Sequence, residues 1–144
     1  MSLVKVLVID DETSLVETLK KRLAKRDLFV IPARSGAEGL ARLAEDSSID
    51  IVILYTKMTG MDGLQTLKHI KIDHPLVEVI MLTEPDTVQA AIEAMKLGAY
   101  DYHMKPCDID ELVGQVAEAE SKRARHEQKI HAARMKEITI KGGV

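Results

Sequence analysis

Short, nearly continuous apolar runs alternate with longer amphipathic segments along residues 1–120, and this alternation constrains the fold more than any other feature. Runs such as "VLVI" and "IVIL" contain no polar residue at alternate positions, which is typical of parallel strands covered on both faces. Five strands are predicted, at Lys5–Asp10, Leu28–Pro32, Asp50–Leu54, Val77–Leu82 and Ala99–Met104. Strands separated by amphipathic segments indicate right-handed βαβ units. The pattern therefore predicts a doubly wound α/β fold with a parallel sheet.

The segments between these strands have helical periodicity and helix-ending signals. Helices are predicted at Glu12–Lys25, after a Ser35 cap, at Gly63–Ile72, at Thr87–Leu97 and after an Asp108 cap. Glu111, three residues after Asp108, completes a start that resembles a capping box. Gly98 is expected to end the fourth helix. Met81 and Met95 are expected to fill the core.

The last predicted helix is longer than a domain of this kind needs. Its apolar stripe weakens near Glu120, while the charged stretch "ESKRARHEQK" continues without Pro or Gly until Gly142. We expect a domain over residues 1–120 and a helical tail or linker over residues 121–144. A dimerising or signalling helix is the alternative, although the apolar residues of the tail are too sparse to predict a coiled coil.

Composition excludes several classes of protein. The chain has 144 residues, of which 46% are hydrophobic, and this suffices for one core. A formal charge of -3 gives no reason to expect a nucleic-acid partner. No apolar run approaches the roughly 20 residues of a membrane helix, and the N-terminus does not resemble a signal peptide. The single cysteine, Cys107, cannot form an internal disulfide and is not expected to be reactive. We expect a cytoplasmic protein without a membrane partner.

Polar residues gather where the strands end, and ligands of open α/β sheets bind at the carboxyl ends of strands. The strand ends supply Asp10, Asp11, Glu12, Tyr55, Thr56, Lys57, Thr83, Glu84 and Lys105. Adjacent carboxylates repel, so a cation or Lys105 is expected beside Asp10 and Asp11, whereas Glu12 is read as capping the first helix. A dinucleotide site is excluded because "DDETS", and not a Gly-rich turn, follows the first strand.

The motifs "VLVIDDE", "DIVIL", "GMDG", "MLT", "GAYDY" and "KP", in this order, resemble the receiver domain of two-component response regulators. The resemblance covers roughly Val4 to Glu118. It implies a flavodoxin-like, doubly wound sheet of five parallel strands in the order 2-1-3-4-5, with helices on both faces; the long last helix extends beyond it. In that family an aspartate at the end of the third strand takes a phosphoryl group from a histidine kinase.

The resemblance also implies roles for individual residues. Asp10 and Asp11 are similar to the acidic pair that binds Mg²⁺, and the backbone carbonyl of Lys57 to a further ligand. The positions implied for phosphate contact and switching are Thr83, Tyr102 and Lys105. The Lys105-Pro106 bond is similar to one that is cis in the family.

Three positions depart from the family pattern. Tyr55 stands where the phosphoacceptor aspartate is expected, and a phenol with a reference pKa near 10 supplies neither the nucleophilic carboxylate nor a good Mg²⁺ ligand. Glu84 replaces a small residue and would repel a phosphoryl group. Thr59 replaces a proline in the loop after the third strand.

The substitution at position 55 changes what is expected of the whole site. Tyr55 pointing inward, with its hydroxyl bonded to an aspartate or Lys105, is favoured over an outward position. Lys105 could then balance Asp10 and Asp11 without a metal, so Mg²⁺ is expected to bind weakly or not at all.

These residues lead us to expect a non-enzymatic receiver module that acts by protein-protein binding and does not accept phosphate by the usual route. Its expected partner is a histidine kinase or another signalling protein. The surface of the fourth helix, fifth strand and last helix would serve that partner or a homodimer. One alternative is a Mg²⁺-dependent phosphoacceptor that uses Thr56 or Tyr55. The other is an ordinary receiver that carries a substitution at position 55.

Overall fold

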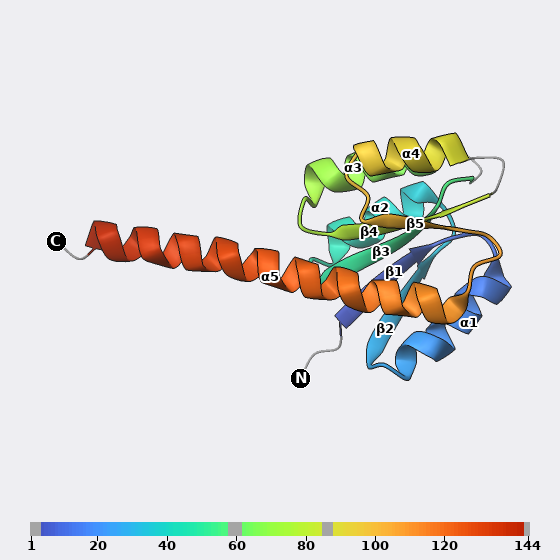
Figure 1. Cartoon of the computed structure of the whole chain (residues 1–144), viewed down its shortest axis with the longest axis horizontal. Coiled ribbons are helices and arrows are strands. Elements are labelled where there is room, and N and C mark those ends of the chain that lie inside the picture. The colour runs from blue at the N-terminus through green and yellow to red at the C-terminus, as the bar shows by residue number, and fades with distance from the viewer. Residues whose placement is uncertain (1–3, 58–61, 85–87, 143–144) are drawn as a thin grey trace.

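The computed structural model describes residues 4–57, 62–84 and 88–142, with side chains described as far as residue 138. Its five strands form one parallel sheet in the order β2-β1-β3-β4-β5 (Figure 1). The strands are β1 (Val4–Ile9), β2 (Leu28–Ala33), β3 (Ile49–Tyr55), β4 (Glu78–Thr83) and β5 (Asp101–Met104). The predicted doubly wound sheet and its strand order are confirmed. Thr59 and Thr87 lie outside the described residues.

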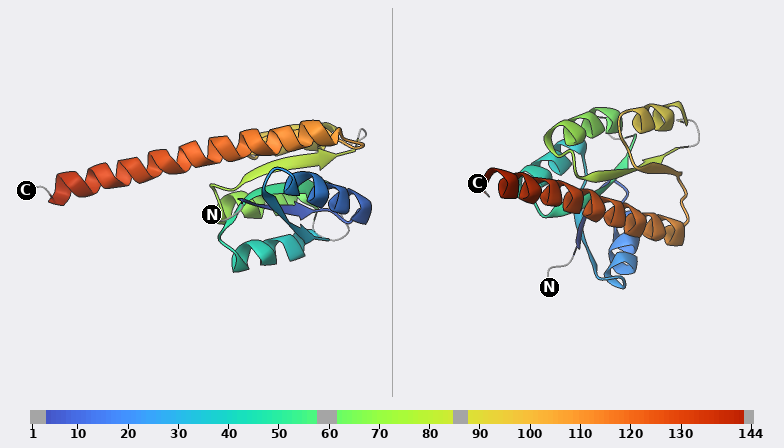
Figure 2. Two further views of the ribbon diagram at one scale, coloured as in Figure 1. Left: turned by 90° about the horizontal axis from the view of Figure 1, so that it is seen from below. Right: turned by 60° about the vertical axis from the view of Figure 1, so that its left-hand side comes forward.

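Helices cover both faces of the sheet. They are α1 (Thr13–Ala24), α2 (Gly36–Glu45), α3 (Gly63–Asp73), α4 (Val88–Lys96) and α5 (Ile109–Gly142). Helices α1 and α5 cover one face, and α2, α3 and α4 cover the other (Figure 2). Two buried layers result, one on each side of the sheet.

The apolar runs of the central strands supply both layers. In β1, Val6 and Val8 pack in the layer beneath α1 and α5, whereas Leu7 and Ile9 pack in the opposite layer. Successive side chains of a strand point to opposite faces, and here both faces are buried. This is why the runs contain no alternating polar residues.

Local capping signals place most helix ends as predicted. The Ser35 hydroxyl accepts a hydrogen bond from the backbone N–H of Glu38 at 3.1 Å. The Asp108 carboxylate accepts one from the backbone N–H of Glu111 at 3.2 Å. Gly98 has a φ of 104°, the left-handed conformation expected after a helix. These expectations are confirmed.

The expected core position of Met95 is wrong. Helix α4 turns its small residues Ala91 and Ala94 into the core, while Ile92 and Met95 are 41% and 40% exposed. A face of alanines lets the helix backbone approach closely, and the larger side chains then lie outside. Met81 in β4 is fully buried, as predicted.

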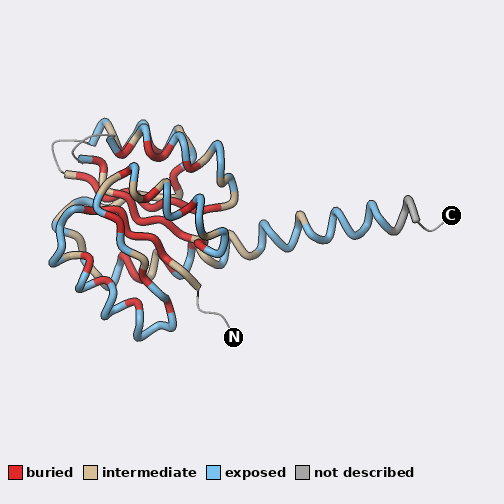
Figure 3. Tube along the Cα trace, turned by 180° about the vertical axis from the view of Figure 1, so that it is seen from behind, coloured by how far each residue is buried: buried red, intermediate tan, exposed pale blue. Residues whose placement is uncertain are grey.

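The last helix continues as one element to Gly142, which confirms the predicted extended C-terminal helix. Its last buried residue among those described is Ala119, and the helix then runs clear of the domain with mostly exposed side chains (Figure 3). Arg123, at the point of departure, pairs with Glu120 at 2.9 Å and lies 3.4 Å from Asp50 of β3. In the described part of the chain, no helix is long and apolar enough to cross a membrane.

Candidate functional site

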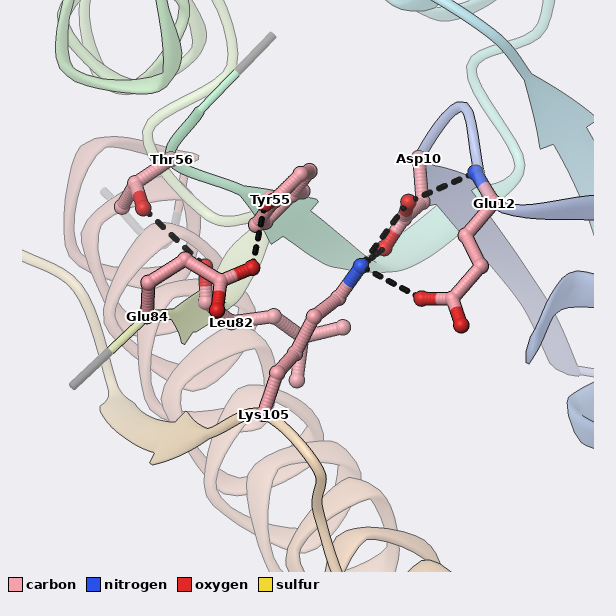
Figure 4. A network of polar contacts seen from close by, with 7 residues as sticks. All are labelled: Asp10, Glu12, Tyr55, Thr56, Leu82, Glu84 and Lys105. Carbon is pink, nitrogen blue, oxygen red and sulfur yellow. Dashed lines mark hydrogen bonds and ion pairs between the residues drawn. The ribbon is translucent and has the colours of Figure 1, made fainter.

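Four neighbouring strands bring their last residues together at the carboxyl edge of the sheet (Figure 4). Asp10 follows β1, Tyr55 ends β3, Glu84 follows β4 and Lys105 follows β5. The parallel register aligns these ends, so residues far apart in the sequence become neighbours. A polar site therefore forms where the strand-end rule predicts it.

Lys105 forms a buried ion pair with Asp10. Its ammonium lies 2.9 Å from Oδ2 of Asp10 and 2.8 Å from Oε2 of Glu12. Burial alone would lower the pKa of Lys105, but its hydrogen bonds with Glu12 and Asp10 raise the pKa above the usual lysine value. Burial raises the pKa of the Asp10 carboxyl, against the lowering effect of the Glu12 backbone N–H and of Lys105. The lysine is thus held by two carboxylates.

The partners of Lys105 differ in part from the prediction. The expected pairing with Asp10 is present, but Glu12 and not Asp11 supplies the second carboxylate. Glu12 stands at the N-cap of α1 and makes no side-chain cap, so its reading as a helix cap is wrong. The Asp11 side chain is exposed.

Tyr55 points into the site, as predicted, but its hydroxyl has a different partner. The hydroxyl donates to Oε1 of Glu84 at 2.5 Å, and the ammonium of Lys105 lies 3.7 Å from the centre of the phenol ring. Burial, and next the Glu84 carboxylate, raise the pKa of Tyr55 above its ordinary value near 10. The phenol is therefore neutral at physiological pH. Tyr55 and Glu84, two departures from the family pattern that no local sequence pattern connects, therefore contact each other.

The remaining expected residues lie at or beside this edge. Thr83 is fully buried, and its hydroxyl has no hydrogen-bond partner within the described residues. The Thr56 hydroxyl donates to the carbonyl of Leu82 at 3.3 Å. Tyr102 is half-buried and packs against the layer beneath α4. The Lys105-Pro106 bond is cis, as the resemblance implies.

The fold and the strand-end site together define a flavodoxin-like module with a polar centre at its carboxyl edge. A family profile described as the response regulator receiver domain matches residues 6–117. The chain therefore belongs to the response regulator receiver family, the receiving module of two-component signalling.

Among curated proteins, the DNA-binding transcriptional regulator NtrC of Escherichia coli K12 is 41% identical over 114 residues, which cover 79% of this chain and 24% of NtrC. The transcriptional regulatory protein ZraR of Klebsiella oxytoca is 37% identical, over 81% of this chain and 26% of ZraR. The chain thus spans about a quarter of the length of these relatives.

Solved structures support the same assignment. A response regulator receiver domain protein from Clostridium thermocellum superposes with a TM-score of 0.80 at 36% identity, over 85% of this chain and 98% of that chain. NtrX from Brucella abortus, solved in complex with ADP, gives a TM-score of 0.81 at 26% identity, over 88% of this chain and 29% of that chain.

Receiver domains commonly bind Mg²⁺, but the residues present here fit that ion poorly. Mg²⁺ prefers oxygen ligands in octahedral geometry, usually including one or two carboxylates. Asp10 is already paired with an ammonium, and a neutral phenol stands at position 55. No group of three His, Cys, Asp or Glu side chains in the described ranges is placed to hold a metal ion. The metal roles of Asp10, Asp11 and the Lys57 carbonyl remain predictions.

Proposed function

We propose that this receiver module does not accept a phosphoryl group at the end of β3 and acts by binding other proteins. The proposal rests mainly on the contacts that Tyr55 makes. Its hydroxyl is bonded to Glu84, and Lys105 lies over its ring. A neutral phenol has no carboxylate with which to form an acyl phosphate, and here it stands at the acceptor position.

The charges around Tyr55 support the same conclusion. A phosphoryl group entering the site would meet the Glu84 carboxylate beside the phenol. Lys105, the expected phosphate contact, is held by Asp10 and Glu12, so it would have to leave two carboxylates to reach a phosphate. Mg²⁺ binding is expected to be weak or absent for the same reason.

The alternative that the hydroxyl of Thr56 or Tyr55 accepts the phosphoryl group has little support. The Thr56 side chain is buried, and its hydroxyl donates to the Leu82 carbonyl. The Tyr55 hydroxyl is bonded to a carboxylate that would repel an incoming phosphate. An ordinary receiver that carries a substitution at position 55 is the remaining alternative, and restoring the aspartate tests it.

We propose that partners bind the surface formed by α4 and β5, together with the adjoining part of α5. This surface exposes four large apolar side chains, which are Val88, Ile92, Met95 and Met104, each 36–41% exposed. Val88, Ile92 and Met95 recur at a helical spacing of four and three residues and so share one face of α4. A histidine kinase, another signalling protein or a second copy of the chain would bury this face.

Phosphorylation in vitro tests the proposal. The wild-type chain and the Tyr55→Asp and Tyr55→Asp/Glu84→Ala variants are incubated with acetyl phosphate and Mg²⁺, and intact mass is measured. We expect no phosphate on the wild type, and an acyl phosphate that is labile to both acid and alkali only in the variants that carry the aspartate, most readily in the double variant.

Other results of the phosphorylation experiment would favour different alternatives. An acyl phosphate on the wild-type chain would contradict the proposal. Phosphate located on Thr56 or Tyr55 by peptide mass spectrometry would favour the hydroxyl acceptor. Full phosphorylation of Tyr55→Asp with Glu84 in place would favour an ordinary receiver with a single substitution.

A further inference from the structure

The charge of the chain is divided unequally between the domain and its helical tail. Residues 121–144 contain seven Lys and Arg against two Glu, a formal charge of +5. Residues 1–120 contain 13 Lys and Arg against 21 Asp and Glu, a formal charge of -8. The overall value of -3, from which no nucleic-acid partner is expected, therefore sums two regions of opposite sign.

Three cations of the tail share one face of α5, which we call the basic stripe. The basic stripe consists of Arg125, Lys129 and Lys136, whose spacings of four and seven residues place them on one side of a helix. At about 100° per residue, this side lies opposite Val116, which is buried against the sheet. All three side chains are exposed, so the basic stripe faces solvent.

The members of the basic stripe have no partner within the molecule. In the described part of the chain, none of them forms an ion pair with a carboxylate. Glu127, a glutamate of the tail, lies 2.6 Å from Arg123 and so is already paired. An exposed helix face that serves only solubility typically mixes both signs at spacings of three and four residues. The basic stripe is instead positive along its whole length and open to an anion from outside the molecule.

The acidic domain does not cancel the charge of the outer part of the tail. Ala119 is the last described buried residue of α5, and beyond it the helix runs clear of the domain (Figure 3). Lys129 and Lys136 lie about 15 Å and about 25 Å further along the helix. Solvent-exposed charges are largely screened from each other beyond about 10 Å at 0.1 M salt. An approaching anion therefore meets the positive tail and not the average charge of the chain.

We propose that the basic stripe binds the phosphate backbone of a nucleic-acid duplex. A DNA duplex carries one negative charge per roughly 1.7 Å of its axis, so each of three cations spread over about 16 Å of helix meets a phosphate. Between Lys129 and Lys136 this face carries Ala132 and Ala133, both exposed, so no bulky side chain holds the helix away from the duplex. The binding is independent of base sequence, weak and sensitive to salt, because it uses phosphates alone.

Other anionic partners fit the basic stripe less well. A protein interface has an apolar core inside its polar rim, and the apolar residues of the basic stripe are only alanines. A helix that lies on an anionic membrane inserts large apolar and aromatic side chains, and residues 121–144 contain no aromatic residue. Single-stranded nucleic acid is bound largely by stacking of bases on aromatic side chains, which the tail also lacks. A duplex needs only the cations.

Fluorescence anisotropy of a short labelled DNA duplex, titrated with the 144-residue chain, tests the proposal. We expect binding at about 0.05 M NaCl, with a slope of about -3 for the logarithm of the binding constant against the logarithm of the salt concentration. Lys129→Gln/Lys136→Gln should weaken binding at least about tenfold and reduce the slope to about -1. Lys20→Gln/Lys21→Gln removes two exposed lysines from α1 of the domain and is the matched control, expected to bind within about twofold of the wild type.

Three results would overturn the proposal. They are a wild-type chain that does not bind the duplex at low salt, a binding constant that does not depend on salt, and equal losses for the tail variant and the control variant. Poly-L-glutamate provides a second arm, in competition with the labelled duplex. If it displaces the duplex at a lower concentration of charge than unlabelled duplex does, the basic stripe is a site for an acidic protein and the proposal is also overturned. Thermal melting by circular dichroism checks that each variant is folded.

Discussion

At the end of β3, the Tyr55 side chain links three strands through two different contacts. Its hydroxyl holds the residue that follows β4, and its ring lies against the ammonium of the residue that follows β5. A charged hydrogen bond of this kind contributes about 1.5–3 kcal/mol when buried and less where solvent reaches it. In this chain, a tyrosine that is hydrogen-bonded to Glu84 stands at the position where the family carries a transient phosphate.

The link between Tyr55 and Glu84 is measurable by a double-mutant cycle. Tyr55→Phe, Glu84→Gln and the double variant are unfolded in urea, and we expect a coupling free energy of about 1 kcal/mol at neutral pH. A coupling indistinguishable from zero would mean that the hydrogen bond does not contribute to stability.

The contribution of the Tyr55–Glu84 pair to stability should also depend on pH in the alkaline range. The pKa of Tyr55 in the folded protein lies above its unfolded value near 10, so the unfolded chain loses this proton first as pH rises. The stability that the neutral phenol confers is fully present below pH ~10 and is lost above it. We expect the wild type to lose more stability than Tyr55→Phe between neutral pH and pH ~10.5. The pKa of Tyr100 is also raised, but its effect is common to both proteins.

Lys105 is the counter-charge that lets Asp10 remain buried. Removing one member of a buried ion pair typically costs about 3–5 kcal/mol, so Lys105→Met should destabilise the protein by about 3 kcal/mol at neutral pH. Burial already raises the pKa of Asp10, and without the ammonium this pKa rises further, so the carboxyl takes up a proton more readily as the pH falls. We therefore expect a smaller loss at pH ~4 than at pH ~7, measured by urea unfolding.

Lys96→Met is the matched control for Lys105→Met. The Lys96 ammonium lies 3.9 Å from Glu93 and is mostly exposed, so we expect a change within about 0.5 kcal/mol at both pH values. Equal losses for Lys105→Met at the two pH values would mean that Asp10 is not the group that needs the lysine.

At the scale of elements, α3 approaches the end of β3 so closely that only glycine fits. A Cβ at Gly63 would lie 2.6 Å from the Cα of Thr56 and 2.7 Å from the carbonyl oxygen of Tyr55. Both are backbone atoms, so α3 would have to move away from the candidate site. We expect Gly63→Ala to destabilise the protein by about 1–3 kcal/mol and to shift the amide NMR signals of residues 55 and 56.

Gly114→Ala is the opposite case on α5. A Cβ there meets no atom within 4 Å, and alanine favours a helix interior over glycine by about 1 kcal/mol. Thermal unfolding should show Gly114→Ala as stabilising and Gly63→Ala as destabilising. The same sign for both substitutions would contradict the steric account.

Some features of these helices and strands could be predicted from the sequence, and others could not. The continuous apolar runs predict buried strands because both faces of β1 and β3 are covered, and the caps at Ser35, Asp108 and Gly98 are local signals. The predicted core position of Met95 is wrong, because alanines and larger residues of α4 compete for the core and packing distance decides between them. The Tyr55–Glu84 bond joins residues 29 apart, and no local pattern records it.

At the scale of the whole molecule, α5 belongs to both the domain and the tail. Its first part completes the layer above β1 and β3 through Leu112, Val116 and Ala119. Its continuation meets the domain through Lys122 and Arg123, whose partners stand at the start of β4 and β3. The Arg123 side chain is only 14% exposed, so this contact fixes the direction in which the tail leaves the domain.

Two truncations test where the folded unit ends. A chain of residues 1–120 keeps every described buried apolar residue, so we expect it to unfold cooperatively. It loses Arg123, which leaves the partly buried Asp50 unpaired, and burial already raises the pKa of that carboxyl. We expect a melting temperature about 5 °C below that of the full chain, by calorimetry.

A chain of residues 1–128 is the control for the shorter truncation, because it retains Arg123 with Glu120, Glu127 and Asp50. Its melting temperature should stay close to that of the full chain, since every described residue that it lacks is exposed except Ile130, which is half-buried. If both truncations melt alike, Arg123 does not anchor the tail. If residues 1–120 fail to fold, the tail belongs to the folded unit and the boundary at residue 120 is wrong.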